Sequence, residues 1–140
     1  MKNVTISVIG AVGSFIAVAL GGWDSAIIAL LSFMAIDYIT GIVVALVFHK
    51  SNKSASGGLE SRAGLKGLCK KCMILLLVVV ANLLDQQMGA TYIRDGVCIA
   101  FMANELLSIV ENASLMGLPI PKIITDALDV LNTNNQQEVE

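Results

Sequence analysis

Most basic residues of this chain fall in one short stretch between long apolar runs. Six of its nine Lys and Arg residues lie between Lys50 and Lys71. The neighbouring runs 4–22, 26–48 and 73–84 contain a single charged residue, Asp37. Membrane proteins keep an excess of Lys and Arg in the loops that stay in the cytoplasm. The pattern therefore predicts an integral membrane protein with a cytoplasmic basic loop that carries Lys50, Lys53, Arg62, Lys66, Lys70 and Lys71.

The composition fits membrane helices better than a soluble domain. Hydrophobic residues make up 56% of the chain and charged residues 14%, whereas soluble domains carry about 25% charged residues. The apolar runs are continuous, while the strands of a membrane barrel would alternate apolar and polar residues. We therefore expect an all-α membrane protein, a small helical bundle that forms one domain over residues 1–131.

Four membrane-spanning helices are predicted, over about residues 4–21, 26–48, 68–84 and 94–112. The first two are long enough for about 30 Å of hydrocarbon at about 1.5 Å per residue. A secretory signal peptide is the alternative for the first, because Lys2 precedes it and Ala17–Ala19 resembles a cleavage site. The length of the run favours a span.

The third and fourth spans are less sharply bounded. The run Met73–Leu84 is too short to cross a bilayer, so the third span has to begin near Leu68, with Lys70 and Lys71 reaching the headgroups. The fourth apolar run, 97–110, contains polar residues, and runs of this length can be re-entrant. Three spans are therefore the alternative to four.

Polar segments separate the predicted helices. Gly22–Ser25 is predicted to form a tight turn in which Asp24 or Ser25 caps the second helix. Residues 50–58 are rich in Gly and Ser and are predicted to form a flexible loop. Residues 60–72 are predicted to form a short basic amphipathic helix at an anionic membrane surface, and Asp85–Gln87 to end the third span.

The cations also predict the topology. If the basic loop is cytoplasmic, the N-terminus is cytoplasmic too, and four spans return the C-terminus to the same side. Arg94 is then the one cation left outside. A three-span chain would instead leave Lys122 outside, and the cation count hardly separates the two topologies.

The C-terminal segment begins with a helix break at Gly117–Pro121. Apolar residues then recur at helical spacing, opposite Asp126 and Asp129, which predicts an amphipathic helix over about 120–131 on the membrane surface or against the bundle. Residues 132–140 are polar and are predicted to be a disordered tail.

Two acidic residues lie within the predicted spans. A carboxylate at the centre of a spanning helix costs about 2.5–3.5 kcal/mol on insertion scales, so Asp37 and Glu105 need an explanation. We expect no Lys, Arg or His within the spans to pair with them. They are then protonated, hydrogen-bonded to neutral groups such as Tyr38, Thr40 or Asn82, or exposed to water in a cavity, an oligomer lumen or a proton-coupled carrier site.

The fourth span carries a polar stripe. Asn104, Ser108 and Glu111 follow the spacing i, i+4 and i+7, with Glu105 and Asn112 beside them. The stripe is either buried against other helices or exposed to water when subunits assemble into a ring. The candidate lesion-lining or intramembrane polar residues are Asp37, Asn104, Glu105, Ser108 and Glu111.

The first span carries small residues that permit close helix packing. They form small-xxx-small pairs, which let two backbones approach in lipid. This packing is expected either within one subunit or between subunits. The residues are Gly10, Gly13, Ser14, Ala17 and Gly21.

Several classes of chemistry are not expected. Cys69 and Cys72 form a single C-x-x-C pair on the predicted cytoplasmic side, and His49 is the only histidine, so neither a metal nor a redox site is predicted. Cys98 is interpreted as a small core residue. We find no nucleophile motif, phosphate-binding loop or zinc signature, and therefore predict no enzyme and no cofactor. The topology accounts for the cations, so no nucleic acid is expected.

The chain resembles the toxin-secretion/phage-lysis holin family of phages and clostridia. The matching segments occur in the order and spacing of that family between Ser32 and Pro121, and the block at Asn104–Asn112 is the most specific. The first helix and the tail beyond Asp126 add nothing to the resemblance. The segments are Asp37–Gly41, Gly67–Lys71, Asn104–Asn112 and Gly117–Pro121.

This resemblance implies a multi-pass protein of the bacterial inner membrane that accumulates, forms a homo-oligomer and opens a lesion at a set time. An endolysin or toxin then passes out as cargo without binding stably, so the implied partners are other copies of the chain and the lipid bilayer. The alternatives are a small four-helix transporter or ion channel, or a non-conducting membrane scaffold. Drug carriers of the first kind use a Glu in the first helix, and this first helix has no acid.

Overall fold

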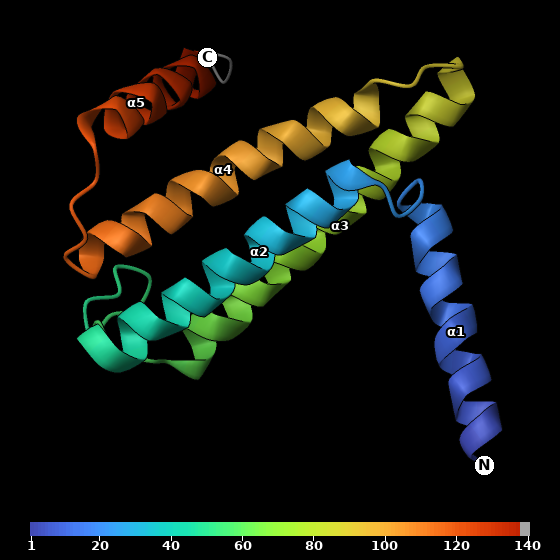
Figure 1. The fold of residues 1–140 in the computed structure, drawn as a ribbon, viewed down its shortest axis with the longest axis horizontal. Coiled ribbons are helices and arrows are strands. Elements are labelled where there is room, and N and C mark those ends of the chain that lie inside the picture. Colours follow the sequence, from blue (N-terminus) through green and yellow to red (C-terminus); the bar gives the residue numbers. More distant parts are fainter. Residues whose placement is uncertain (138–140) are drawn as a thin grey trace.

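The computed structural model describes residues 1–137, which are helical apart from short connections, without a strand in that range (Figure 1). The all-α fold class is therefore confirmed. A π-helical turn, η1, continues the second helix before the loop at residues 49–60. The helices are α1 (Lys2–Ala19), α2 (Ser25–Val43), η1 (Val44–Phe48), α3 (Ser61–Met88), α4 (Ile93–Leu115) and α5 (Lys122–Gln137).

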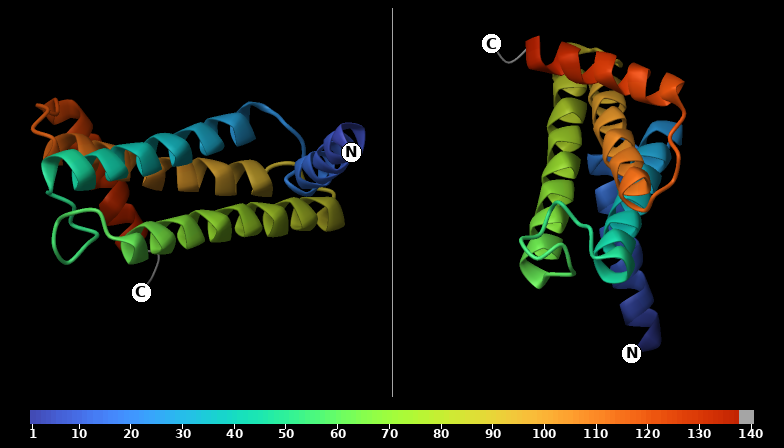
Figure 2. Two further views of the ribbon diagram at one scale, coloured as in Figure 1. Left: turned by 90° about the horizontal axis from the view of Figure 1, so that it is seen from below. Right: turned by 90° about the vertical axis from the view of Figure 1, so that its left-hand side faces the viewer.

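Helices α2, α3 and α4 run alongside one another and form the bundle (Figures 1 and 2). Its apolar core takes residues from each of the three, at positions that recur every three or four residues along α2. The side chains of Ile27, Leu30, Val78 and Cys98 are fully buried there, which confirms that Cys98 is a small core residue. Asp24 caps α2 as predicted, because its Oδ1 accepts the amide N–H of Ile27 at 3.1 Å.

Helix α3 is longer than predicted and is continuous. The short basic helix and the third span are one element, since residues 61–88 contain no proline and the helix passes through Gly64 and Gly67. Asp85–Gln87 does not end it. The helix ends at Gly89, whose φ of +65° is the left-handed conformation typical of a helix C-terminus.

Three helices of the described chain are long and apolar enough to cross a membrane: Lys2–Ala19, Ser25–Phe48 and Ser61–Met88. Helix α4, which carries Arg94, Asp95, Glu105 and Glu111, is not among them. Arg94, Glu105 and Asn112, however, are buried against the other helices and do not face the surroundings. Crossing by α4 stays a prediction, because Asp95, Asn104 and Glu111 of the same helix are exposed.

Helix α1 extends away from the bundle, and none of its side chains is buried (Figure 1). A Cβ added at Gly10 or Gly13 would find no neighbouring atom within 4 Å, so these two glycines do not pack against the rest of the chain. Packing of these residues between subunits stays a prediction, whereas Gly21 lies against Arg94 and Asn82 of the same chain. Gly21 lies outside the helix, in the turn, where its φ is +87°.

Helix α5 follows the predicted break after Gly117 and lies apart from the bundle (Figure 2). The helix continues to Gln137 and so includes residues 132–137 of the tail that was predicted to be disordered. Residues 132–137 contain no Gly or Pro, and their polar side chains are compatible with a helix. Residues 138–140 of the predicted tail lie outside the described residues.

A buried arginine fastens the turn between α1 and α2 to the start of α4. The Arg94 guanidinium donates hydrogen bonds to the carbonyl oxygen of Leu20 and, at 2.7 and 3.0 Å, to the carboxylate of Asp24. A third acceptor is Asp95, at 2.9 Å. Arg94 is 6% exposed and forms ion pairs, and its place on the outer side of the membrane stays a prediction. We call these residues the Arg94 cluster.

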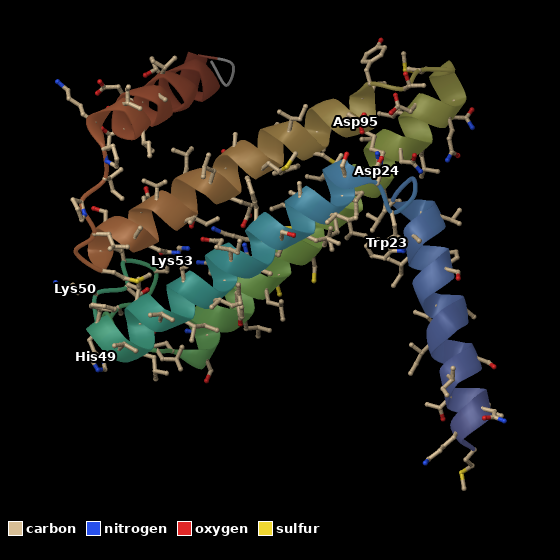
Figure 3. All side chains as sticks on the ribbon, viewed as in Figure 1. Trp23, Asp24, His49, Lys50, Lys53 and Asp95 are labelled. Carbon is tan, nitrogen blue, oxygen red and sulfur yellow. The ribbon has the colours of Figure 1, made fainter. Side chains whose placement is uncertain are left out.

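Two further contacts complete this end of the bundle. Asp85 of α3 accepts the amide N–H groups of Ile93 and Arg94 at 3.0 and 2.9 Å, and so caps the first turn of α4. A Cβ at Gly21 would lie 2.6 Å from Nε of Arg94, which explains why glycine occupies the turn. Figure 3 shows Asp24 and Asp95 at this end and His49 and Lys50 at the opposite end.

We predict that Asp24 stays ionised well below the usual range of a carboxyl group. The hydrogen bond from Arg94 lowers the pKa of Asp24 from 3.8 to about 2. Because the folded-state pKa is the lower one, the contact contributes fully above pH 3.8 and is lost as the pH falls through about 2. A carbon-13 NMR titration in detergent micelles measures this midpoint. Arg94→Gln should move it back toward 3.8, and an unchanged low midpoint would contradict the assignment.

Candidate functional site

One lysine bridges two carboxylates from two other helices near the middle of the bundle. Lys71 of α3 donates a hydrogen bond at 2.7 Å from Nζ to Oδ2 of Asp37 on α2, and a second to Oε2 of Glu105 on α4. The three side chains are 8–12% exposed. A buried charge is tolerated when it is paired and hydrogen-bonded, and these three groups satisfy one another.

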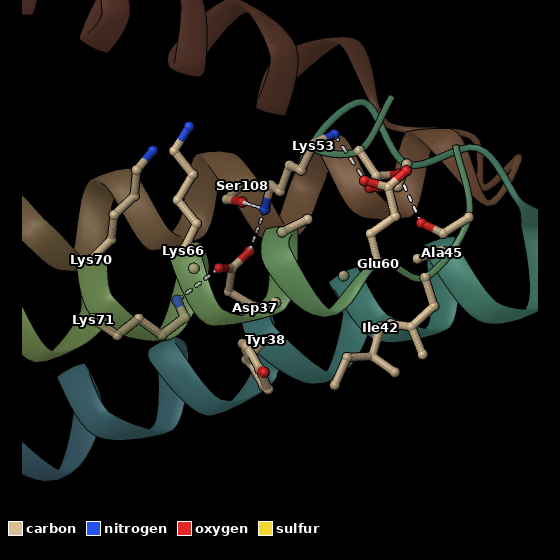
Figure 4. A pocket seen from close by; sticks show the side chains of 18 of the residues that line it. Asp37, Tyr38, Ile42, Ala45, Lys53, Glu60, Lys66, Lys70, Lys71 and Ser108 are labelled. Carbon is tan, nitrogen blue, oxygen red and sulfur yellow. Dashed lines mark hydrogen bonds and ion pairs between the residues drawn. The ribbon is translucent and has the colours of Figure 1, made fainter. Parts of the chain in front are cut away.

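The loop after η1 adds a second cation to this group. Nζ of Lys53 donates to Oγ of Ser108 at 2.9 Å and lies 3.7 Å from Oδ1 of Asp37 (Figure 4). Unlike Lys71, the Lys53 side chain is 49% exposed. The formal charges of the two lysines therefore balance those of Asp37 and Glu105.

An amide completes the coordination of Asp37. Nδ2 of Asn112 lies 3.2 Å from Oδ1 of Asp37, 3.3 Å from its carbonyl oxygen and 2.9 Å from Oγ1 of Thr40. In the described residues, every buried side-chain nitrogen or oxygen has a hydrogen-bond partner. The interconnected polar residues of the three helices and the loop form one group, which we call the Lys71 cluster: Asp37, Lys53, Lys71, Glu105, Ser108 and Asn112.

The loop that supplies Lys53, which the sequence predicts to be flexible, is held in a turn by hydrogen bonds of its own. The amide N–H of Ser51 donates to the Gly57 carbonyl at 2.9 Å, and Oγ of Ser56 donates to the Glu60 carboxylate at 2.7 Å. The latter contact lowers the pKa of Glu60. Gly57 has a φ of +76°, and a Cβ there would lie 2.6 Å from the carbonyl oxygen of His49. The chain therefore turns tightly enough to bring Lys53 back over the bundle.

The expectation that Asp37 and Glu105 lack a cationic partner is wrong. It placed Lys71 at the headgroups, because the third span was taken to begin near Leu68. The helix begins three turns before Lys71, and this residue shares a face with Ile74, Val78 and Asp85, which point inward. That spacing is the signal in the sequence that could have identified Lys71 as an inward-facing residue.

The predicted polar stripe of α4 is divided between two faces. Glu105, Ser108 and Asn112, at i, i+3 and i+7, point into the bundle and join the Lys71 cluster. Asn104 and Glu111 are exposed on the adjacent face of the helix. Of the five candidate residues, the structure brings together Asp37, Glu105 and Ser108.

A cleft of about 450 Å³ leads from the basic loop to the Lys71 cluster (Figure 4). It lies between α2 and the first half of α3, and the folded loop covers part of it. Its lining includes the predicted basic-loop residues Lys53, Lys66, Lys70 and Lys71, but neither Lys50 nor Arg62.

The site offers charge pairing and no obvious group for covalent chemistry. Within residues 1–137, no three His, Cys, Asp or Glu side chains gather closely enough to hold a metal ion. Cys69 and Cys72 are exposed free thiols on α3 and do not line the cleft. The arrangement can hold three helices together electrostatically and can release them when the charges find other partners.

Removal of the Lys71 ammonium should destabilise the bundle strongly. Lys71→Met leaves two buried carboxylates beside each other, and breaking a buried pair costs about 3–5 kcal/mol. Unfolding in mixed micelles with increasing dodecyl sulfate measures the change. Lys70→Met is the matched control, because Lys70 is exposed on the same helix. Addition of Asp37→Asn and Glu105→Gln to Lys71→Met should recover most of the loss. Equal stability of the two lysine variants would contradict a central role for Lys71.

Comparisons with known proteins agree on one family. The model of the bacteriophage holin family matches residues 14–133. A probable holin of Bacillus phage phi105 is 37% identical over 106 residues, which cover 75% of this chain and 73% of that protein. An uncharacterised protein of Clostridium perfringens is 37% identical over 125 residues, covering 88% and 87% of the two chains.

An uncharacterised protein of Listeria monocytogenes is 30% identical over 129 residues, covering 91% of this chain and 86% of the relative. No solved structure matches the chain significantly. The resemblance seen at Asp37–Gly41 and Asn104–Asn112 thus extends over most of the chain, and three of its helices are apolar enough to span a membrane. The chain belongs to the bacteriophage holin family and is a holin-like, multi-pass membrane protein.

Proposed function

We propose that this protein accumulates in the bacterial cytoplasmic membrane, self-associates and opens a lesion that lets an endolysin or a toxin leave the cell. The observation that carries the proposal is the Lys71 cluster, which buries charge inside a bundle whose outer surface is largely apolar. Because these charges are paired inside the bundle, a single copy can insert without exposing them to lipid. The same polar side chains could line an aqueous lesion after the helices separate.

The energetics of the cluster support a closed and an open arrangement. A carboxylate facing lipid at mid-membrane costs about 2.5–3.5 kcal/mol, so Asp37 and Glu105 stay paired while the helices are surrounded by lipid. Once neighbouring copies provide a water-filled space, the same charges can be hydrated. Asn104 and Glu111, which are exposed on α4, are the further polar residues that we assign to a contact with another copy or with water.

The proposed orientation follows from the basic loop. Lys50, Lys53, Arg62, Lys66 and Lys70 are all exposed on one end of the bundle, and the excess of cations assigns that end to the cytoplasm. Crossing by α1 would place the N-terminus on the same side. The apolar surface of α1 is not buried and is suited to contact with lipid or a second copy. Small residues would permit close packing there: Gly10, Gly13, Ser14 and Ala17.

A transporter or channel is the second candidate, and the cleft favours it. An opening of about 450 Å³ that reaches two carboxylates near the middle of the bundle is a feature that an ion or proton pathway would need. The similarity to a probable phage holin supports lesion formation instead. A non-conducting scaffold is the third possibility and would leave the membrane potential intact.

The orientation can be tested with one engineered cysteine. Ala55 is exposed in the basic loop, so Ala55→Cys in a background without the three native cysteines presents an accessible thiol. If the loop is cytoplasmic, a membrane-impermeant maleimide should label this thiol only after the cells are opened. Trp23→Cys, at the opposite end, is the control that should react in intact cells. The reverse pattern would contradict the orientation.

Lesion formation can be tested by expression together with an endolysin that has no signal sequence. We expect a delay, abrupt loss of membrane potential and then lysis, whereas neither protein alone should clear the culture in that way. Cross-linked membranes should contain species larger than a dimer. A strictly monomeric protein that never releases the endolysin would contradict the proposal and favour a carrier or a scaffold.

Charge variants connect the lysis time to the cluster. Asp37→Asn and Glu105→Gln each remove one charge that holds the bundle closed, so lysis should begin earlier at equal amounts of protein in the membrane. Lys50→Met, at an exposed lysine that does not line the cleft, is the control and should leave the time unchanged. Unchanged timing in both carboxyl variants would show that the cluster has no part in lesion formation.

A further inference from the structure

The cleft beside the Lys71 cluster has a basic rim that the cluster does not use. Lys66 and Lys70 lie one turn apart on α3, and both line the cleft. Figure 4 shows their side chains extending in the same direction from the helix. Within residues 1–137, the structure assigns neither ammonium group to an ion pair or a side-chain hydrogen bond.

The acidic groups of the cleft are already engaged elsewhere. Asp37 and Glu105 pair with Lys71, and Lys53 adds its charge at 3.7 Å from Asp37. Glu60, the remaining carboxylate on the lining, accepts hydrogen bonds from the side chain and the amide of Ser56 at 2.7 and 3.1 Å. The lining holds four lysines and three carboxylates, so an anion is the complementary ligand for the rim.

The walls of the cleft are apolar. Ile42 and Ala45 line it on the side of α2 and η1, and Leu59 and Ile74 on the side of the loop and α3. Gly64 and Gly67 have no side chain to fill the cleft beside α3. A Cβ at these positions would approach only Tyr38, at 3.6 and 3.9 Å. A cationic rim above apolar walls is complementary to an amphiphile that carries a negative headgroup.

We propose that this cleft is a specific site for an anionic phospholipid. The ammonium groups of Lys66 and Lys70, at i and i+4, both contact the lipid phosphate, since such positions are neighbours on a helix surface. The glycerol backbone and the first part of an acyl chain lie against Ile42 and Ile74. The volume of about 450 Å³ is within the range of small-molecule sites but is too small for a whole phospholipid.

The location favours a lipid over a soluble phosphate compound. Lys66 and Lys70 belong to the basic segment that precedes the apolar part of α3, which begins at Met73, and their long side chains can extend toward anionic headgroups on the side of the basic loop. The inference depends on the chain being a membrane protein and does not depend on its opening a lesion.

The test uses the full-length protein in a neutral detergent, with binding of phosphatidylglycerol and phosphatidylcholine followed by native mass spectrometry. Wild type should retain phosphatidylglycerol preferentially. The double variant Lys66→Gln/Lys70→Gln should bind it more weakly by about tenfold or more. Lys50→Gln/Arg62→Gln is the matched control, because it removes the same charge from the same basic loop outside the cleft. It should keep most of the affinity.

A third variant tests the cleft without a change of charge. Gly67→Leu should fill the space between α3 and Tyr38 and reduce binding of phosphatidylglycerol, with helicity checked by circular dichroism. Equal losses in the two double variants would overturn the proposal in favour of diffuse attraction. Unaltered binding by a folded Gly67→Leu protein, or equal retention of both lipids by wild type, would also overturn it. Competition by millimolar inorganic phosphate as effective as that by the lipid would identify a soluble-phosphate site instead.

Discussion

The ammonium group of Lys71 connects three helices that otherwise meet through apolar contacts. It pairs with Asp37 on α2 and with Glu105 on α4, and all three side chains are nearly buried. Water does not compensate these charges, so each depends on the others being in place. None of α2, α3 and α4 can move away from its neighbours unless a charge finds a new partner. The bundle is therefore held together by ion pairs, which assembly with other copies or hydration can break.

The other end of the bundle is fastened differently. Arg94 contacts the α1–α2 turn and Asp24, while Asp85 caps α4, so three chain segments meet around one guanidinium. Asp24 is about half exposed, and this cluster is therefore open to water from the start. The core residues Ile27, Leu30 and Val78 lie between the two clusters. The bundle therefore has a half-exposed ion pair at the end near the turns and nearly buried ion pairs nearer the basic loop.

Hydropathy and charge predicted the all-α membrane fold, because continuous apolar runs have few alternatives in lipid. They did not predict the partner of Asp37. Lys71 belongs to a cluster of cations in the sequence, and only the inward face of α3, repeated at Ile74 and Val78, distinguishes it from Lys70. The loop that returns Lys53 to Ser108 depends on the turn at Gly57. Such long-range contacts depend on how helices are placed relative to one another, which periodicity within one helix does not determine.

The placement of charge also explains how a lesion-forming protein could first accumulate harmlessly. If Asp37 and Glu105 faced lipid in each copy, insertion would be penalised by several kcal/mol per chain. Pairing with Lys71 inside the bundle offsets part of that penalty, and Lys53 balances the remaining charge from the loop. Lys53 is half exposed, whereas Lys71 is buried, so Lys53 can leave the cluster with less rearrangement. In the proposed lesion, the first contact to break is therefore the one between the basic loop and α4, at Ser108, and separation of α2, α3 and α4 follows from it.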